Sequence, residues 1–286
     1  MIFVVIFYAG NILIGKAINE LPPFTIAFFR LFIAFLIILP IAWKKAWQDR
    51  ALFLQYKKPF IFMTLSGVTF FNTFIYGSLQ FTTSSNVAVL ETVIPALTVV
   101  LSAILLKERL IKIQWFGVCL SLIGALWVVM DGKIFNLASM IWNPGDFIMI
   151  GAIISWSIYS IMVKKYMHLF PSFAALLVMT GISIIVLLPI VAVEWLLVGV
   201  PTLFEPNLMV GLLYLGVFPS FIALMFFNRA VSVLGASKSS IFLNFLPVFT
   251  IIGAYLWLGE QITSMQITGA VIVIAGVIMT TQAKRK

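Results

Sequence analysis

Long apolar stretches alternate along the chain with short clusters of polar residues, prolines and glycines. A helix that crosses a bilayer needs roughly 20 mostly apolar residues and bonds its own backbone polar groups, so each stretch predicts a membrane-spanning α-helix. Apolar runs such as Leu176–Leu188 do not alternate in polarity, which excludes a β-barrel. The polar and Pro/Gly clusters divide the chain into ten expected spans: residues 1–17, 24–43, 59–79, 84–106, 112–130, 145–165, 172–195, 208–229, 236–258 and 264–283.

The amino-acid composition agrees with a membrane protein. Of the 286 residues, 63% are hydrophobic and 9% are charged, a balance that no water-soluble domain of this size could keep in solution. The apolar run from Ile2 has neither a basic leader nor a small-residue cleavage site, so we expect a retained helix rather than a signal peptide. Cys119, the one cysteine, lies in an apolar stretch and is expected to be a small buried side chain.

The cationic residues predict the orientation of the chain, because cytoplasmic loops carry an excess of Lys and Arg. With both termini inside, the outer segments contain only Lys16 and Lys133, and Arg30 lies within a span. We therefore expect a multi-pass protein of the cell membrane with cytoplasmic N- and C-termini, whose net charge of +9 requires no nucleic acid as a partner. The inner segments hold the remaining cations: Lys44, Lys45, Arg50, Lys57, Lys58, Lys107, Arg109, Lys112, Lys164, Lys165, Arg229, Lys238, Lys284, Arg285 and Lys286.

The chain contains an internal duplication. Several proline, acidic, amide and glycine positions recur with one constant offset of 152 residues. The offset divides the chain into halves 1–131 and 144–283, joined by residues 132–143, with five expected spans in each. Because five is odd, the second copy must be inverted in the membrane, so we predict an all-α membrane protein of ten transmembrane helices in two inverted five-helix repeats, a recurrent transporter design. The recurring pairs are Pro95/Pro247, Glu108/Glu260, Gln114/Gln266, Gly117/Gly269 and Gly124/Gly276.

Several of these residues resemble those of a known family. The opening Phe7–Asn11 with Lys16, Leu21–Pro23 and Ala27–Arg30 resembles the start of the EamA family of the drug/metabolite transporter (DMT) superfamily, and so do the two repeat endings. The resemblance implies ten helices, with a central cavity lined mainly by spans 1–4 and 6–9 and with spans 5 and 10 at the periphery. Family members are thought to export amino acids and related metabolites, whereas more distant relatives move nucleotide sugars and triose phosphates. The repeat endings are Pro95 to Lys107–Arg109 to Gly117, and Pro247 to Gly259–Glu260 to Gly269.

Two ionisable residues within the expected spans are the first candidates for function, because charges in a bilayer are costly unless they are paired or hydrated. Arg30 and Glu91 both lie roughly 10 Å below the outer surface, as the rise per helical residue gives. Equal depth permits an ion pair that clamps two helices together. Alternatively, Glu91 lines the cavity, where its protonation or its contact with a substrate ammonium changes access, which leaves proton coupling open. A third possibility is that the two residues do not meet.

Amide and aromatic side chains form a second group of candidates. Asn11, Asn72 and Asn244 can donate and accept hydrogen bonds, which suits a zwitterionic ligand but also suits contacts between helices. Trp156 and Tyr159 are three positions apart and share a helix face. They are expected to form either an aromatic wall for a ligand or a packing contact.

The recurring prolines, carboxylates and glycines have structural interpretations. Pro95 and Pro247 each remove an intrahelical hydrogen bond, so each is expected to bend its span and is a candidate hinge. Glu108 and Glu260 precede the next helix, where a carboxylate can cap exposed backbone N–H groups. The spaced glycines mark faces for close helix approach, either within the chain or between copies, so a monomer and a homodimer both remain open.

The remaining sequence features indicate a transporter rather than an enzyme. His168, the one histidine, lies in an expected loop, so neither a metal site nor a Cys–His pair is predicted, and no cofactor is expected. No Walker motif for ATP occurs. We predict a secondary transporter, an exporter of amino acids or related zwitterionic or polar metabolites, with the bilayer and a small-molecule substrate as partners. An intramembrane enzyme or a receptor or scaffold is the alternative, but the first needs convergent Asp, His and Ser groups and the second needs no inverted repeat.

Overall fold

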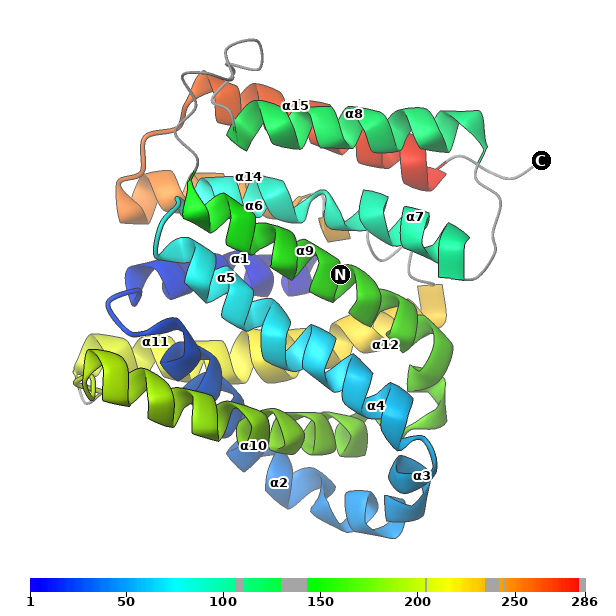
Figure 1. Ribbon diagram of the computed structural model, residues 1–286, viewed down its shortest axis with the longest axis vertical. Helices are drawn as coiled ribbons and strands as arrows, with labels where there is room; N and C mark the ends of the chain where they lie inside the picture. Colours follow the sequence, from blue (N-terminus) through cyan, green and yellow to red (C-terminus); the bar gives the residue numbers. More distant parts are fainter. Residues whose placement is uncertain (106–110, 130–142, 204, 235–241, 244, 283–286) are drawn as a thin grey trace.

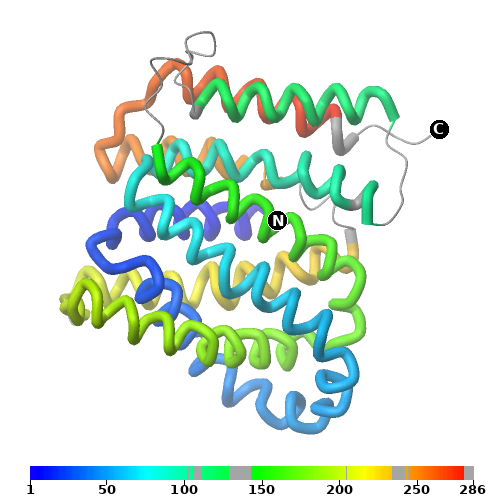
Figure 2. Tube along the Cα trace, in the orientation of Figure 1, coloured from blue at the N-terminus to red at the C-terminus, as the bar shows by residue number. Residues whose placement is uncertain are grey.

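The computed structural model describes the chain except residues 106–110, 130–142, 204, 235–241, 244 and 283–286. Asn244, Glu108 and most of the expected linker 132–143 therefore lie outside the described residues. Every regular element in the described ranges is helical. Figures 1 and 2 show these helices stacked side by side, with the helices of the two halves interleaved.

The first half contains eight described helices and one π-helical segment, η1. Helices α4, η1 and α5 follow one another without a gap and form one long stretch. The elements are α1 (Ile2–Ala17), α2 (Pro23–Gln48), α3 (Arg50–Gln55), α4 (Lys57–Met63), η1 (Thr64–Phe70), α5 (Phe71–Leu79), α6 (Ser84–Glu91), α7 (Ile94–Leu105) and α8 (Lys112–Val129).

The second half contains two π-helical segments, η4 between α11 and α12 and η5 after α14. Among the described residues of both halves, six helical stretches are long and apolar enough to cross a membrane, and four shorter helices are also apolar. The chain is thus an all-helical membrane protein in its described part, while the ten-span inverted arrangement stays a prediction. The elements are α9 (Pro144–Tyr166), η3 (Met167–Leu169), α10 (Ser172–Val198), α11 (Pro206–Val217), η4 (Phe218–Ala223), α12 (Leu224–Leu234), α14 (Leu246–Gly253), η5 (Ala254–Leu258) and α15 (Ser264–Gln282).

Helices α8 and α15 lie together at one edge of the molecule (Figure 1). A β-carbon at Gly269 would lie 2.1 Å from Val128 and 3.1 Å from the carbonyl oxygen of Gly124, and one at Gly276 would lie 2.6 Å from the carbonyl oxygen of Gly117. The early part of each helix thus meets the late part of the other, so the two run antiparallel. The recurring glycines therefore serve close packing within the chain.

The expectation that Cys119 is buried is wrong, because its side chain is exposed. It lies on α8, whose large apolar side chains such as Phe116 and Ile123 are 60% and 50% exposed. Helix α8 covers the rest of the molecule with one face only. The other face is suited to contact with lipid, and hydropathy alone does not distinguish a lipid-facing side chain from a buried one.

The fourth expected span is broken next to its acidic residue. Pro95 has no N–H to donate to the carbonyl of Glu91, so the α-helical pattern cannot continue across this point. Helix α6 ends at Glu91, and a turn in which the N–H of Val93 donates to the carbonyl of Leu90 at 3.0 Å leads into α7. Pro247 is the second residue of α14, so both prolines stand at the start of a helix.

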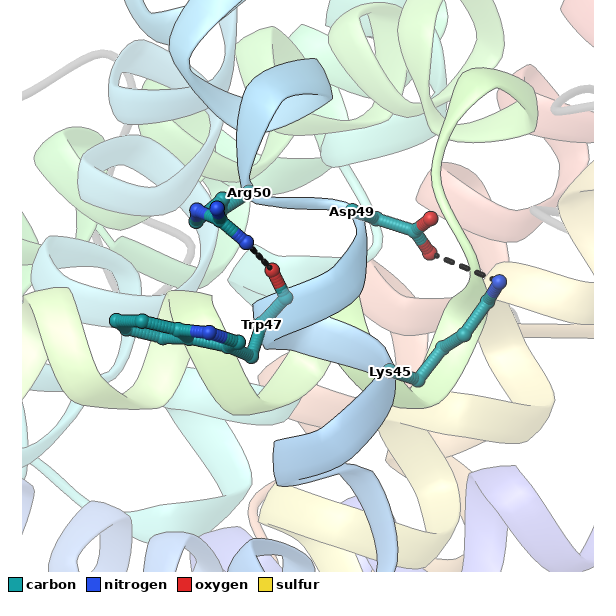
Figure 3. A network of polar contacts seen from close by, with 4 residues as sticks. All are labelled: Lys45, Trp47, Asp49 and Arg50. Atoms are coloured by element: carbon teal, nitrogen blue, oxygen red, sulfur yellow. Dashed lines mark hydrogen bonds and ion pairs between the residues drawn. The ribbon is translucent and has the colours of Figure 1, made fainter.

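An exposed corner joins α2 to α3, as Figure 3 shows. Lys45 pairs with Asp49 at 3.2 Å, and Arg50 donates to the carbonyl of Trp47 at 3.0 Å while lying over its ring. Lys45 is 56% exposed, so this pair contributes only about 0–1 kcal/mol to stability. The corner carries no cavity-lining residue.

Candidate functional site

A small cavity lies between helices of both halves. The space open to the centres of water-sized spheres is about 30 Å³, room for roughly two water molecules. A metabolite larger than that requires a wider state of the cavity.

The cavity wall is built from equivalent positions of the two halves. The π-helical segments η1 and η4 each supply residues to it, and π-helical turns are frequent at functional sites. Residues on either side of the break after α6 and residues at and just before the start of α14 also line the cavity. The paired lining positions, 152 residues apart, are Gly67/Pro219, Val68/Ser220, Asn72/Leu224, Glu91/Leu243 and Ile94/Leu246.

Arg30 on α2 is the centre of a buried polar cluster. Its Nη1 donates to the side-chain oxygens of Asn11 at 2.8 Å and Asn72 at 2.6 Å, and also to the hydroxyl of Tyr76. Its Nε donates to the hydroxyl of Ser220 at 2.7 Å. The hydroxyl of Tyr76 donates in turn to Asn11 at 2.7 Å. These contacts join α1, α2, α5 and η4, so the cluster spans both halves of the chain.

The positive charge of Arg30 is buried without a carboxylate partner among the described residues. Its side chain is 2% exposed, and all four of its hydrogen-bond partners are neutral. A cation within a membrane costs several kcal/mol on insertion scales, about +2.5 to +3.5 at a helix centre. Hydrogen bonds to a charged group, about 1.5–3 kcal/mol each, offset that cost. The geometry fixes the guanidinium in place and leaves its charge available to an anion.

Glu91 lines the same cavity but does not pair with Arg30. No ion pair joins them, and no hydrogen bond of the Glu91 side chain is found in the described part of the chain. The sequence-based ion pair is therefore not formed in this structure. Equal depth along two helices was a necessary condition for a contact, but the direction in which each side chain points decides it.

Aromatic rings form another side of the cavity. Trp156 on α9 packs against Phe71 with ring centroids 4.3 Å apart, and Tyr8 on α1 meets Trp156 edge-on at 6.0 Å. The hydroxyl of Tyr8 is buried and has no hydrogen-bond partner among the described residues. Tyr8 therefore offers a polar group to a ligand next to an aromatic surface.

Tyr159 supports this wall from behind rather than lining it. Its ring contacts Trp156 at a centroid distance of 5.0 Å, and its hydroxyl donates to Asn228 at 2.9 Å. A β-carbon at Gly67 would lie 2.2 Å from the Tyr159 ring, so glycine is required for this close approach. Tyr159 is fully buried, which agrees with the packing interpretation.

The structure brings most of the sequence-predicted candidates to one place. The cavity is lined by Asn11, Arg30, Asn72, Glu91 and Trp156, whereas Asn244 lies outside the described residues. No group of three metal-ligating side chains occurs in the described part of the chain, and His168 is exposed.

Sequence reasoning missed several cavity residues, although helical spacing contained a signal for two of them. Tyr8 precedes Asn11 by three positions, and Tyr76 follows Asn72 by four, so each pair shares a helix face. Ser220 offered no comparable signal, because its contact with Arg30 depends on how the two halves pack.

Comparisons with known proteins identify the family of the chain. The model of the EamA-like transporter family matches residues 1–130 and 143–282. The chain is 27% identical to the S-adenosylmethionine uptake transporter of Rickettsia prowazekii (strain Madrid E), over 94% of this chain and 86% of that protein. It is 25% identical to the probable amino-acid metabolite efflux pump of Salmonella typhimurium (strain LT2), over 96% of this chain and 91% of that protein. One crystal structure of a protein, 15% identical, matches 98% of this chain and 96% of its own with a TM-score of 0.63, a similarity of fold alone.

Proposed function

Because the chain belongs to the EamA-like transporter family, we propose that it is a secondary transporter that moves small metabolites by alternating access through the central cavity. Amino acids or related polar and zwitterionic compounds are the proposed substrates, and export is the proposed direction. The observation that carries this proposal is the presence of Arg30 and Glu91 in one cavity wall without an ion pair between them in the described residues. A zwitterion neutralises both, because it presents a carboxylate to the guanidinium and an ammonium to the carboxylate.

The names of the family and of the relatives indicate transport rather than enzyme catalysis. One relative is named for uptake and the other for efflux of amino-acid metabolites, and the second supports the proposed substrates and direction. An intramembrane enzyme remains the rival, but the described lining of the cavity supplies no histidine and only one carboxylate.

Protons or the substrate gradient itself drive the proposed transport. Glu91 is the carboxylate of the described cavity lining, and the charged and titratable groups that line the cavity with it are Arg30 and Tyr8. A proton on Glu91 would remove the negative charge that a substrate ammonium requires. The proton and the substrate therefore compete for Glu91, and this competition couples their transport.

The proposed architecture is the inverted repeat in the cell membrane with cytoplasmic termini. It is supported by the 152-residue spacing of the paired cavity positions and by the antiparallel packing of α8 against α15. A cavity shared by equivalent elements of two inverted halves can open to either side by related movements.

Counterflow of labelled amino acids in proteoliposomes, with and without a pH gradient, tests the proposal. We expect the unmodified protein to exchange at least one zwitterionic amino acid. Glu91→Gln is isosteric, so it should keep the fold while reducing counterflow roughly tenfold or more, because the ammonium loses its charged partner. The response to the pH gradient should disappear as well.

Glu20→Gln is the matched control, since Glu20 is exposed and lies outside the cavity lining. It should leave counterflow and folded protein unchanged. A stable and fully active Glu91→Gln protein would eliminate the role of Glu91, and the absence of counterflow for every amino acid in the unmodified protein would eliminate the substrate class.

A further inference from the structure

A carboxylate from the second half binds the N-terminus of a short helix in the first half. Glu260, just after η5, accepts from the backbone N–H of Ser84 at 2.9 Å and from its hydroxyl at 2.7 Å through Oε1. Its Oε2 accepts from the N–H of Ser85 at 3.2 Å and from its hydroxyl at 2.8 Å. A carboxylate at this position satisfies exposed N–H groups of α6 and interacts favourably with the helix dipole.

Glu260 does not cap the helix that follows it, contrary to the expectation from sequence. The first turn of α15 is closed by its own residues, because Thr263 and Gln266 exchange backbone-to-side-chain hydrogen bonds at 3.1 and 3.2 Å. Gln266 also donates to the side-chain oxygen of Asn86 on α6 at 2.8 Å. Glu260 and Gln266, which both follow η5, thus bind α6, an element of the other half.

A second carboxylate of the same half holds a different helix. Glu194 on α10 accepts from the N–H of Phe24 at 3.1 Å, and from the N–H and hydroxyl of Thr25 at 2.8 and 2.7 Å. Trp195 donates to the hydroxyl of Thr25 at 2.8 Å and stacks on Phe29. The contacts of Glu260 and Glu194, here called tethers, therefore join the second half to α6 and α2. These two helices carry the charged cavity residues Glu91 and Arg30.

The two tethered helices differ in their freedom to move. Helix α2 is continuous from Pro23 to Gln48, so its N-terminus cannot swing without displacing Arg30 from its hydrogen-bond partners. Helix α6 has only eight residues and ends in the break at Thr92–Val93. It can therefore rotate about this break while Glu91, adjacent to it, remains near the cavity.

We propose that the contact of Glu260 with Ser84 and Ser85 is the gate of the cavity at this end of the molecule, and that it opens in each transport cycle while the contact of Glu194 with Thr25 stays closed. The inference rests on the proposed transport function. The cavity holds only about two waters in this structure, so a metabolite requires one end to open. Glu260 is partly exposed, so water can replace its carboxylate at the N-terminus of α6 when Glu260 and α6 separate.

Access to a cysteine in the cavity measures the gate directly. In a Cys119→Ser background, Val68→Cys reports on the cavity through its modification by a membrane-impermeant thiol reagent added from the Glu260 side. Glu260→Gln should raise the modification rate about tenfold. The neutral amide accepts weaker hydrogen bonds from Ser84 and Ser85 than the carboxylate does, which shifts the population toward the open state.

Glu194→Gln is the matched control, because it removes the carboxylate that binds the N-terminus of α2, a helix that is expected to stay in place. It should leave the modification rate within about twofold, since a lost tether that is not a gate does not change the population. An unchanged rate in folded Glu260→Gln protein, or an equal rise in both variants, would overturn the proposal.

A second experiment keeps Glu260 and therefore applies even if Glu260→Gln fails to fold. Gln266 on α15 and Asn86 on α6 are in contact at 2.8 Å, and cysteines at these two positions, bridged by a cleavable bifunctional thiol reagent, should stop counterflow, whereas cleavage should restore it. The same bridge between Thr25 and Glu194 should leave counterflow intact. Counterflow that persists in the bridged Asn86–Gln266 protein would overturn the gate. If the unmodified protein shows no counterflow, the proposed function fails, whereas the modification rates still report on the gate.

Discussion

The two walls of the cavity occupy equivalent backbone positions but differ in chemistry. The first-half wall carries Asn72 and Glu91, whereas the positions 152 residues later are Leu224 and Leu243. Arg30 likewise corresponds to the apolar Ile182 on α10. Ser220, which is equivalent to Val68, is the one paired lining position where the second half supplies the polar group.

The two halves therefore share the backbone structure of the site but not its polar side chains. Both halves keep the π-helical segment and the proline next to the cavity, which determine where backbone can be irregular and where side chains can enter. The polar groups are concentrated on one side. A second buried arginine at position 182 would need its own set of acceptors and would repel the first, so a one-sided arrangement costs less free energy.

Removing the charge from the polar wall should have the largest effect. Arg30→Met leaves the acceptors of four hydrogen bonds without their donor, so we expect a loss of about 3 kcal/mol in the free energy of unfolding and loss of counterflow. Ile182→Met at the equivalent position should cost less than about 1.5 kcal/mol. Thermal unfolding in detergent and counterflow measure both. Equal losses for the two variants would show that the walls are equivalent after all.

Exchanging the amide between the walls should have the next largest effect. Asn72→Leu removes an acceptor of Arg30 and should cost about 2 kcal/mol, and Leu224→Asn buries an amide without this partner at a cost of about 1–3 kcal/mol. The double variant should be as unstable as the sum of the two, because Arg30 stays on the first wall. Recovery of stability in the double variant would contradict the asymmetry of the cavity.

Replacing Ser220, the polar residue of the second wall, should have the smallest effect. Ser220→Ala removes one neutral acceptor from Nε of Arg30 while the other partners remain, so stability should fall by about 1 kcal/mol. Counterflow should fall less than in Asn72→Leu. The rank order of Arg30→Met, Asn72→Leu and Ser220→Ala in one thermal-stability series checks this. A loss for Ser220→Ala as large as that for Arg30→Met would place the main support of the charge on the second wall.

Much of the helical framework could be predicted from the sequence, but side-chain partners could not. The start and end of helices such as α9 and α15 fall within a few residues of the expected spans 145–165 and 264–283. The ion pair between Arg30 and Glu91 that equal depth permitted is absent from the described structure, because depth along a helix does not specify which way a side chain points. Glu260 was expected to cap α15, but it caps α6 instead.

By itself, the sequence determined the membrane environment and the helical class, and it predicted the duplication and the positions where proline interrupts a span. These are local or periodic properties, because hydrophobic length, missing N–H groups and recurring residues can be read without knowing which helices touch. Only the tertiary structure decided that the charge of Arg30 is held by Asn11, Asn72, Tyr76 and Ser220 and remains available in the cavity. That arrangement depends on the rotation of each helix about its axis and on the packing of one half against the other, which no single segment contains.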